Sequence, residues 1–331
     1  MNNNQIKKQL YRISSRNKKK AENKIRPLAL ESAYPRRLPF AWKEKHILRS
    51  RHKIWIGALL IILVIALIRM VIWLDAYNLN RTSRIIVKEG IDYDYFREML
   101  LPEDIYRDIN VCYQSGEEKE SECKAEYAAI YTLLKQNKLI KGDNVSAGKF
   151  DYLKERLQEN KSCQELTGYY ESILSDIKLF PVKIEEAEKV SYVDTWSELR
   201  NYGGNRRHEG TDIFPKENTR GKYKVISATD GVVERLGWLE KGGYRVGIRA
   251  PHGAYFYYAH LDSYAKGLGI GDIIKAGDLL GYMGDSGYGK EGTRGKFPVH
   301  LHFGIYADTV LGELSVNPYR SLLYLEKKHS D

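Results

Sequence analysis

Cysteine is scarce in this chain of 331 residues. Its three cysteines are Cys112, Cys123 and Cys163, and none follows residue 163. Three thiols allow at most one internal disulfide, with three possible pairings. A catalytic cysteine is not favoured, because no histidine lies between residues 75 and 190 to activate it. We therefore expect structural cysteines, and the sequence does not decide whether any pair is oxidised.

Acidic residues are rare at the N-terminus. Residues 1–53 contain 16 Lys or Arg and 3 Glu, whereas the whole chain has a net charge of +10. The rest of the chain is therefore slightly acidic. The basic segment adjoins an apolar run and lacks a folded aromatic and basic surface, so we expect it to set membrane topology and contact anionic lipids, not nucleic acid.

Long apolar runs are absent except for one, "IWIGALLIILVIALIRMVIWL" at residues 54–74, in which Arg69 is the one charge. At about 1.5 Å per residue this run spans roughly 31 Å, enough to cross a hydrocarbon core of about 30 Å. It is longer than the apolar region of a cleavable signal peptide, so we expect an uncleaved anchor. The positive-inside rule then places residues 1–53 in the cytoplasm and residues 75–331 outside the membrane.

The two parts beyond the anchor have different patterns. Residues 75–190 carry apolar residues at helical spacing and no motif with recognisable chemistry, which predicts a mainly helical spacer or partner-binding domain. Residues 191–331 alternate short strand-like runs with glycine turns, which predicts an all-β domain built on an antiparallel sheet. The fold class expected for the whole chain is therefore α+β. The strand-like runs are "YKVISA", "TDGVVERLGW", "YRVGIRA", "AYFYYAHL", "DIIKAG", "LLGYMGDSG" and "VHLHFGIY".

Four of the eight histidines lie in suggestive positions: His208, His260, His300 and His302. The other four, His46, His52, His252 and His329, need no special explanation. His300 and His302 are two residues apart in a strand-like run, so their imidazoles point to the same face of a sheet. Such a pair on its own is equally compatible with two half-exposed strand residues.

The stretch "HEGTD" at residues 208–212 invites comparison with the His-Glu-x-x-His helix of zinc proteases. Asp212 stands where that motif has its second histidine, and Gly210 would cost a helix about 1 kcal/mol relative to Ala. A turn leading into a strand fits better, and Glu209 is then expected to face solvent and not to act as a base.

A catalytic zinc site uses three protein ligands and leaves the fourth position to water. His208, Asp212 and one of the pair His300 and His302 supply such a set. The remaining histidines are then available to act as a general base or to hydrogen-bond a developing oxyanion. A structural zinc site is more often closed by four ligands and rich in Cys, so an open catalytic site is favoured here.

Residues 191–331 resemble the lysostaphin-type (LytM-type) zinc endopeptidases that cut peptide bonds in bacterial peptidoglycan. The resemblance rests on six stretches in the same order: "RRHEGTDIF", "ATDGVVERLGW", "GGYRVGI", "YAHLDSY", "GDIIKAGDLLGYMGDSG" and "HLHFGIY". It implies an antiparallel sheet with a groove whose floor holds the metal. The segments "NYGGNRR" and "GDSGYGKEGTRGKFP" are expected to form walls of that groove.

The resemblance also implies roles for individual residues. The zinc ligands are His208 and Asp212, from the His-x3-Asp motif, and His302, the second histidine of the His-x-His motif. His260 and His300 flank the reacting water and the scissile carbonyl. Tyr202, just upstream of the first ligand, corresponds to a tyrosine that helps to stabilise the oxyanion.

The function expected from these observations is that of a single-pass protein of the bacterial cell membrane, with an extracytoplasmic zinc endopeptidase domain that acts on cross-bridge or stem peptides of peptidoglycan. The helical segment 75–190 is expected to hold that domain away from the membrane or to bind a protein partner. The alternative is a peptidoglycan-binding scaffold of a cell-envelope or sporulation complex, or an activator of another hydrolase. All five site positions are filled, which favours the enzyme.

Overall fold

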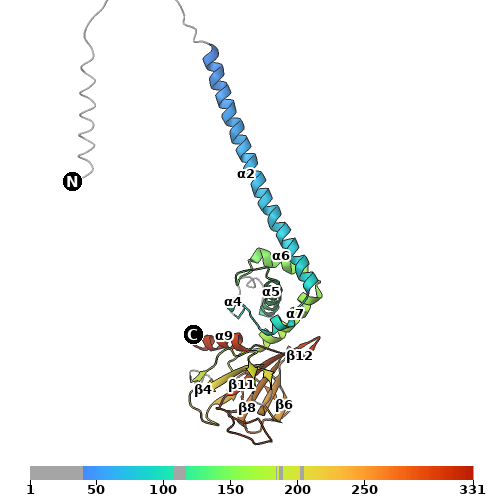
Figure 1. Cartoon of the computed structure of the whole chain (residues 1–331), viewed down its shortest axis with the longest axis vertical. Helices are drawn as coiled ribbons and strands as arrows, with labels where there is room; N and C mark the ends of the chain where they lie inside the picture. The colour runs from blue at the N-terminus through green and yellow to red at the C-terminus, as the bar shows by residue number, and fades with distance from the viewer. Residues whose placement is uncertain (1–39, 107–116, 184, 186–188, 202–204, 331) are drawn as a thin grey trace, which may run out of the picture. The chain divides into compact units, whose positions relative to one another are not determined.

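The computed structural model describes residues 40–106, 117–183, 185, 189–201 and 205–330 (Figure 1). The chain divides into two compact units, Met1–Arg69 and Met70–Asp331. Two residues with expected roles, Tyr202 and Cys112, lie outside the described residues, so their expectations stay untested.

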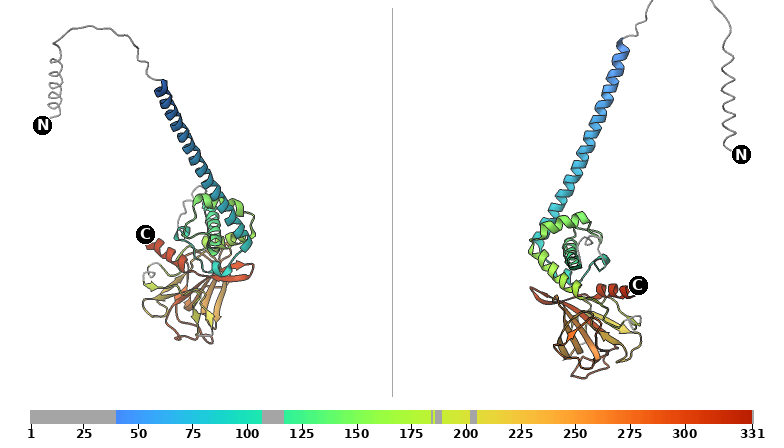
Figure 2. Two further views of the ribbon diagram at one scale, coloured as in Figure 1. Left: turned by 45° about the horizontal axis from the view of Figure 1, so that its top comes forward. Right: turned by 180° about the vertical axis from the view of Figure 1, so that it is seen from behind.

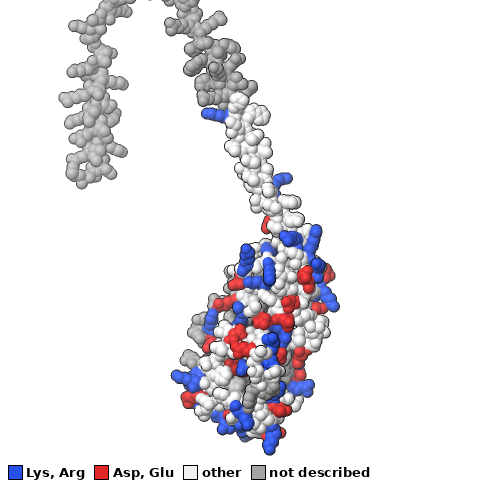
Figure 3. Space-filling view, in the orientation of Figure 1, with Lys and Arg blue, Asp and Glu red and all other residues white. Residues whose placement is uncertain are grey.

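Helix α2 runs from Phe40 to Glu89 and contains the apolar run 54–74. The large apolar side chains from Ile54 to Leu74 are each at least 39% exposed, and Figure 3 shows this stretch as an almost uncharged band. Among the described residues, one helical segment, His52–Glu89, is long and apolar enough to cross a membrane, judged by length and composition alone. No described part of the protein covers this apolar surface.

The described part of the segment between α2 and the sheet contains five further helices. A side-chain cap begins two of them: Asp92 accepts a hydrogen bond from the backbone N–H of Tyr95, and Asn160 accepts one from that of Cys163, both at 3.0 Å. These caps satisfy N–H groups that lack a partner in the first turn of a helix. Asn160 therefore separates α6 from α7, where the apolar pattern alone is continuous. The helices are α3 (Tyr93–Arg97), α4 (Glu103–Tyr106), α5 (Glu117–Gln136), α6 (Ala147–Leu157) and α7 (Lys161–Asp176).

Aromatic side chains fill the space between these helices. Phe96 lies with its ring centroid 5.6 Å from that of Tyr169 and 5.3 Å from that of Tyr170. The buried hydroxyl of Tyr170 pairs with Thr132 at 2.7 Å. Cys163 is a buried free thiol, and Cys123 is disulfide-bonded. The helical segment is thus a packed body with an aromatic interior in which the hydroxyls of Tyr170 and Thr132 satisfy each other.

A ten-stranded sheet forms the C-terminal part, and all of its strand pairs are antiparallel. Its main path is β1-β4-β11-β8-β7-β6-β9, while β10 pairs with β5 and β8, and β12 pairs with β11; β2 and β3 form a separate two-stranded sheet. The strands are β1 (Val190–Ser191), β2 (Leu199–Arg200), β3 (Arg206–Arg207), β4 (Thr211–Pro215), β5 (Lys224–Ile226), β6 (Gly231–Leu239), β7 (Gly243–Arg249), β8 (Tyr255–Tyr264), β9 (Ile273–Ile274), β10 (Leu279–Met283), β11 (Leu301–Thr309) and β12 (Gly312–Val316).

The antiparallel sheet confirms the expected architecture, and each of the seven strand-like runs contains a strand. The all-β expectation is wrong at the C-terminus, where α9 runs from Tyr319 to Ser330. Leu322 and Leu325, three residues apart, are both buried in this helix. Tyr324 stacks on Tyr106 of α4 with 5.6 Å between ring centroids. Helix α9 therefore forms because it buries an apolar stripe against the helical segment.

The helical segment packs directly on the sheet (Figure 2). Buried residues of both parts belong to one hydrophobic cluster, which extends from Ile86 to Leu325. At the end of α7, the buried carboxylate of Asp176 accepts hydrogen bonds from the backbone N–H (3.1 Å) and the Nδ1–H (2.8 Å) of His252. The backbone N–H of Asn317 donates to Arg97 of α3 at 2.8 Å. The segment 70–331 is accordingly a single packed unit.

Candidate metal centre and its groove

Two adjacent strands position the centre. In the register of β4 and β11, His302 lies directly opposite Asp212. Side chains at directly opposed positions of neighbouring strands lie on the same face and contact one another. His208 comes from the segment just before β4, where its backbone N–H donates to Glu198 and its carbonyl accepts from Ser197, both at 2.9 Å. The turn and strand expected for "HEGTD" are therefore observed.

Gly210 allows these residues to converge. Its φ is +153°, and a Cβ at this position would lie 2.7 Å from the His302 ring and 2.7 Å from the carbonyl oxygen of Phe303. Contacts under about 3 Å to a backbone atom cannot be relieved by moving a side chain. A side chain at position 210 would therefore push β4 and β11 apart and separate the residues that they carry.

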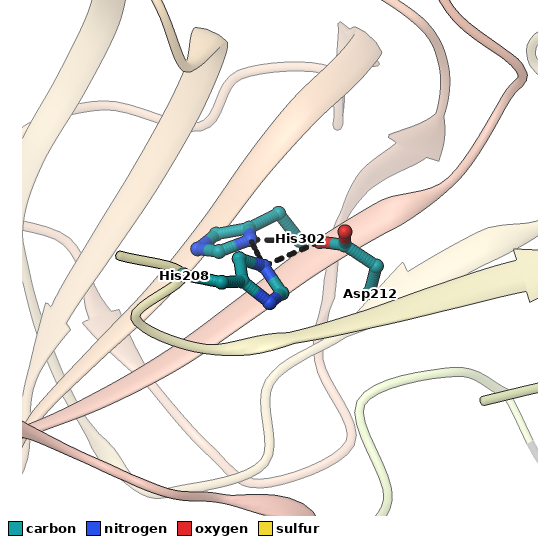
Figure 4. A group of neighbouring side chains, drawn as sticks. All are labelled: His208, Asp212 and His302. Carbon is teal, nitrogen blue, oxygen red and sulfur yellow. Dashed lines mark hydrogen bonds and ion pairs between the residues drawn. The ribbon is translucent and has the colours of Figure 1, made fainter. Parts of the chain in front are cut away.

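Three donor atoms meet at one point (Figure 4). His208 Nε2 lies 3.1 Å from Asp212 Oδ1 and 3.1 Å from His302 Nδ1, and the last two atoms are 2.9 Å apart. Ligands of a tetrahedral zinc ion, bound at about 2.1 Å, stand roughly 3.4 Å apart. Two imidazoles and a carboxylate at nearly this spacing fit a zinc ion after a small outward movement.

Hydrogen bonds from neighbouring residues fix the orientation of two of these side chains. The backbone carbonyl of Thr195 lies 3.2 Å and its hydroxyl 2.9 Å from His208 Nδ1. Arg200 Nη2 lies 3.1 Å from the same nitrogen. These neighbours hold Nδ1 away from the centre, so Nε2 is the nitrogen that faces Asp212 and His302 and is placed to bind a metal. Arg200 Nη2 donates to Asp212 Oδ2 at 3.0 Å, which leaves Oδ1 to face the two imidazoles.

Burial alone raises the pKa of Asp212, but hydrogen bonds with His208 and His302 and the positive potential of the nearby imidazoles outweigh it. The pKa of Asp212 is therefore held well below its usual range. The carboxylate is ionised at neutral pH, which is the form that binds a metal.

His260 and His300 lie beside the three donors, with 4.7 Å between their ring centroids. His260 Nδ1 donates to the carbonyl of Ser286 and His300 Nδ1 to that of Pro298, both at 2.8 Å. Each Nε2 therefore has a free lone pair. Burial, followed by the positive potential of neighbouring imidazoles, lowers the pKa of His260 well below 6.5, and burial also lowers that of His300. Both rings are neutral and can accept a proton at neutral pH.

The backbone of His260 is in the left-handed region, with φ +63°. This conformation is unfavourable for a residue with a Cβ, and strained residues of this kind cluster at functional sites. The hydrogen bond from its N–H to Gly242, at 2.8 Å, holds the residue in place. The pairing of β8 with β7 is irregular at this point, because the register shifts between Tyr258 and Leu261.

A groove surrounds the centre. Its walls include aromatic rings that contact the two non-ligand histidines: Phe297 lies 4.7 Å from His260, and Phe214 stacks on His300 at 5.1 Å between centroids. The segments expected as walls, "NYGGNRR" and "GDSGYGKEGTRGKFP", contribute Arg206, Tyr288 and Lys296. The groove lining comprises Arg200, Arg206, His208, Asp212, Phe214, His260, Tyr288, Lys296, Phe297, Pro298, His300 and His302.

Comparison with known proteins identifies the family to which a chain with this arrangement belongs. The sequence model of Peptidase family M23 matches residues 206–318, which include all five of the His and Asp residues above. The crystal structure of a LytM protein from Ruminococcus gnavus ATCC 29149, provisionally named a glycyl-glycine endopeptidase, is 42% identical in sequence; the match covers 76% of this chain and 96% of that one, with a TM-score of 0.58. The chain belongs to peptidase family M23. Because the match covers three quarters of the chain, it includes helices as well as the sheet.

Two curated relatives match this M23 chain over part of their length. L-Ala–D-Glu endopeptidase of Bacillus subtilis (strain 168) is 45% identical over 148 residues, which are 45% of this chain and 44% of that protein. Glycyl-glycine endopeptidase ALE-1 of Staphylococcus capitis is 32% identical over 136 residues, 36% of this chain and 33% of that protein. The chain thus spans less than half of the length of these relatives.

The structure of the M23 chain brings together His208, Asp212, His302, His260 and His300, five of the six residues singled out from the sequence. The sixth, Tyr202, lies outside the described residues. Sequence reasoning missed Arg200, which contacts the carboxylate of Asp212 from a two-residue strand. No motif marks Arg200. The solvent-facing position expected for Glu209 is observed, but its carboxylate also pairs with Arg97 at 2.7 Å.

Proposed function

We propose that this M23 chain is a membrane-anchored zinc metalloendopeptidase that hydrolyses peptide bonds of peptidoglycan cross-bridges or stem peptides. The observation that carries the proposal is the convergence of two metal-ligating imidazoles, one carboxylate and two further neutral imidazoles on the floor of one groove. A purely structural metal site has no use for the last two.

His208, Asp212 and His302 would hold the zinc ion, which, when bound, supplies Lewis acidity and activates water. His260 presents Nε2 to the groove in the tautomer that accepts a proton, so it takes the proton of the attacking water and returns it to the leaving nitrogen. His300 Nε2 lies 3.8 Å from Asp212 Oδ1. Because the His300 ring is neutral and Nε2 carries a lone pair, it accepts a hydrogen bond from the attacking water and orients that water toward the scissile carbonyl.

The apolar surface of α2 supports the membrane part of the proposal. Residues 54–74 act as the anchor, with residues 1–53 in the cytoplasm and residues 75–331 outside. The helical segment holds the peptidase domain outside the membrane and offers a surface for a protein partner. Its contacts with the sheet mean that the position of the groove follows that of the helices.

The test compares peptidoglycan fragments by mass spectrometry after incubation with the full-length protein in detergent and zinc, or with its His260→Ala variant. We expect new amino and carboxyl ends from the unmodified protein and a rate about 10²- to 10⁴-fold lower from the variant, which should still bind zinc. The new ends also identify the bond that is cut. The names of the two curated relatives specify different bonds, L-Ala–D-Glu in one and glycyl-glycine in the other. Bound zinc without new ends would refute the enzyme and favour the scaffold alternative.

A further inference from the structure

A second hollow adjoins the groove, and we call it the basic recess. It is lined by Arg206, Lys241, Tyr257 and Tyr306, and it shares His260 and His302 with the metal centre. Tyr257 comes from β8 and Tyr306 from β11, the strands that also carry these two histidines. A group in the basic recess is therefore next to the reacting atoms.

The cations of the basic recess have no acidic partner. Within the described residues, no carboxylate pairs with Lys241 or with Arg206, whose guanidinium instead donates to the hydroxyl of Tyr288 and lies over its ring. The one acid in the lining, Glu209, is already engaged with Arg97 at 2.7 Å. The recess therefore has a net positive charge that nothing in the described part of the protein neutralises.

Two hydroxyl groups add hydrogen-bond donors. Tyr257 and Tyr306 are partly buried and line the recess. Burial raises the pKa of both, to about 12 for Tyr306, so both stay protonated and can donate at neutral pH. Their side chains are therefore placed to donate a hydrogen bond to a ligand in the recess.

Gly242 lets the Tyr257 hydroxyl lie close to the backbone. A Cβ on Gly242 would lie 2.2 Å from the Tyr257 hydroxyl oxygen, so any residue other than glycine would displace this hydroxyl from the recess. Hydroxyl donors and cations around one hollow match the oxygen atoms of a carboxylate.

We propose that the basic recess binds a free carboxylate of the peptide substrate, carried by a residue next to the scissile bond, so that this chain prefers acidic peptides to neutral ones. The proposal rests on the proposed function, since it concerns the substrate of the same centre. The shared walls argue for a substrate group and not a separate anion: a carboxylate in the recess is within reach of a carbonyl held between His260 and His302.

The test uses two synthetic stem peptides that contain L-Ala–D-Glu and differ at one group, a free α-carboxylate on the glutamate or the corresponding carboxamide. The full-length zinc-loaded protein is compared with the variants Tyr306→Phe and Lys241→Met, and with Lys266→Met as a control for an exposed lysine outside both hollows. Cleavage kinetics, melting temperature and peptide binding to a His260→Ala background are measured for each.

We expect the unmodified protein to cleave the carboxylate peptide with a kcat/KM about tenfold or more above that of the carboxamide, as for a hydrogen bond to a charged group. Tyr306→Phe and Lys241→Met should each raise KM for the carboxylate peptide several-fold and raise it less for the carboxamide peptide, which carries no charge, with the melting temperature unchanged. Lys266→Met should change neither, and added salt should weaken the preference.

Equal kcat/KM for the two peptides would overturn the recess proposal and leave the proposed function intact, as would variants that slow both peptides equally. If neither peptide nor peptidoglycan is cleaved, the proposed function fails. The binding measurement then tests separately whether the recess binds the carboxylate. Tighter binding of the carboxylate peptide, lost in Lys241→Met, would support the recess, and equal binding would refute it.

Discussion

Two buried aspartates, one where the helices meet the sheet and one on the floor of the groove, show how similar chemistry serves different ends. Asp176 accepts from His252 Nδ1 at 2.8 Å, and Asp212 lies 2.9 Å from His302 Nδ1. Asp176 accepts from one histidine side chain and from the backbone N–H groups of His252 and Ala254, and burial raises its pKa. The pKa of Asp212 is instead held well below its usual range.

The difference lies in the kind of partner. The donors around Asp176 each have a proton to give, so this group fastens α7 to the turn after β7. At Asp212, one carboxylate oxygen lies close to two imidazole nitrogens, three atoms that can each bind a metal, while Arg200 holds the second oxygen. A cluster with more donor atoms than it can satisfy internally is a binding site; a single matched pair is a structural fastening.

The largest effect on activity is expected from a change in the groove, beside Asp212. His302→Ala should remove zinc binding and lower hydrolysis by roughly 10³-fold or more, because a ligand is lost and the metal supplies several kcal/mol of transition-state stabilisation. His252→Ala should leave zinc content and kcat within about twofold. Metal analysis and peptidoglycan digestion check both, and hydrolysis retained by His302→Ala would disprove its role as a ligand.

A smaller effect is expected at the other aspartate. Asp176→Ala leaves the N–H groups of His252 without their acceptor, which should lower the free energy of unfolding by about 1 to 3 kcal/mol. Urea unfolding followed by tryptophan fluorescence measures this change. Activity should be unaffected at temperatures where the variant is folded; a change in kcat at such temperatures would mean that the α7 contact also shapes the groove.

The smallest effect is expected where the helical segment reaches the metal-binding loop. Arg97 of α3 donates to Glu209 and, at 2.9 Å, to the carbonyl of Ser315, and so holds the residue after His208. Arg97→Ala and Glu209→Ala should each lower kcat/KM by about three- to fivefold, since a partly exposed ion pair is worth about 1 kcal/mol or less. As a positioning pair, the two changes together should cost no more than either alone.

Glu209→Ala also separates positioning from catalysis. A general base lost from this position would lower the rate by about 10²- to 10⁴-fold and alter the pH profile. An unchanged pH profile, with partial recovery in Arg97→Lys, is the result expected here. Additive losses in the double variant would show that Arg97 and Glu209 act independently.

Much of the groove floor could be predicted because strand geometry is local. The alternation of side chains in a strand places His300 and His302 on one face, and the four-residue spacing of His208 and Asp212 around Gly210 predicts a turn into a strand. Family resemblance then assigned each a distinct role. The structure places all four together with His260, which sequence spacing alone does not link to them.

The rest depended on contacts between distant residues. Arg97 and Glu209 are 112 residues apart in the sequence, and Arg97 and Ser315 are 218 apart. Nothing in a helical apolar pattern distinguishes a segment that stands alone from one that shares a core with a sheet. Arg200 carries no motif because its role comes from where β2 places it. Helix α9 was missed for the same reason, since its Tyr324 packs on Tyr106, which lies far earlier in the chain.

The buried thiol of Cys163 offers an internal reporter on the opening of α7. It is 7% exposed, and burial raises its pKa to about 11, so in the folded state it is neither reachable nor ionised. Thiol reagents attack the thiolate, so labelling requires α7 to open. The labelling rate therefore measures how often α7 opens, in the unmodified protein and without any introduced probe.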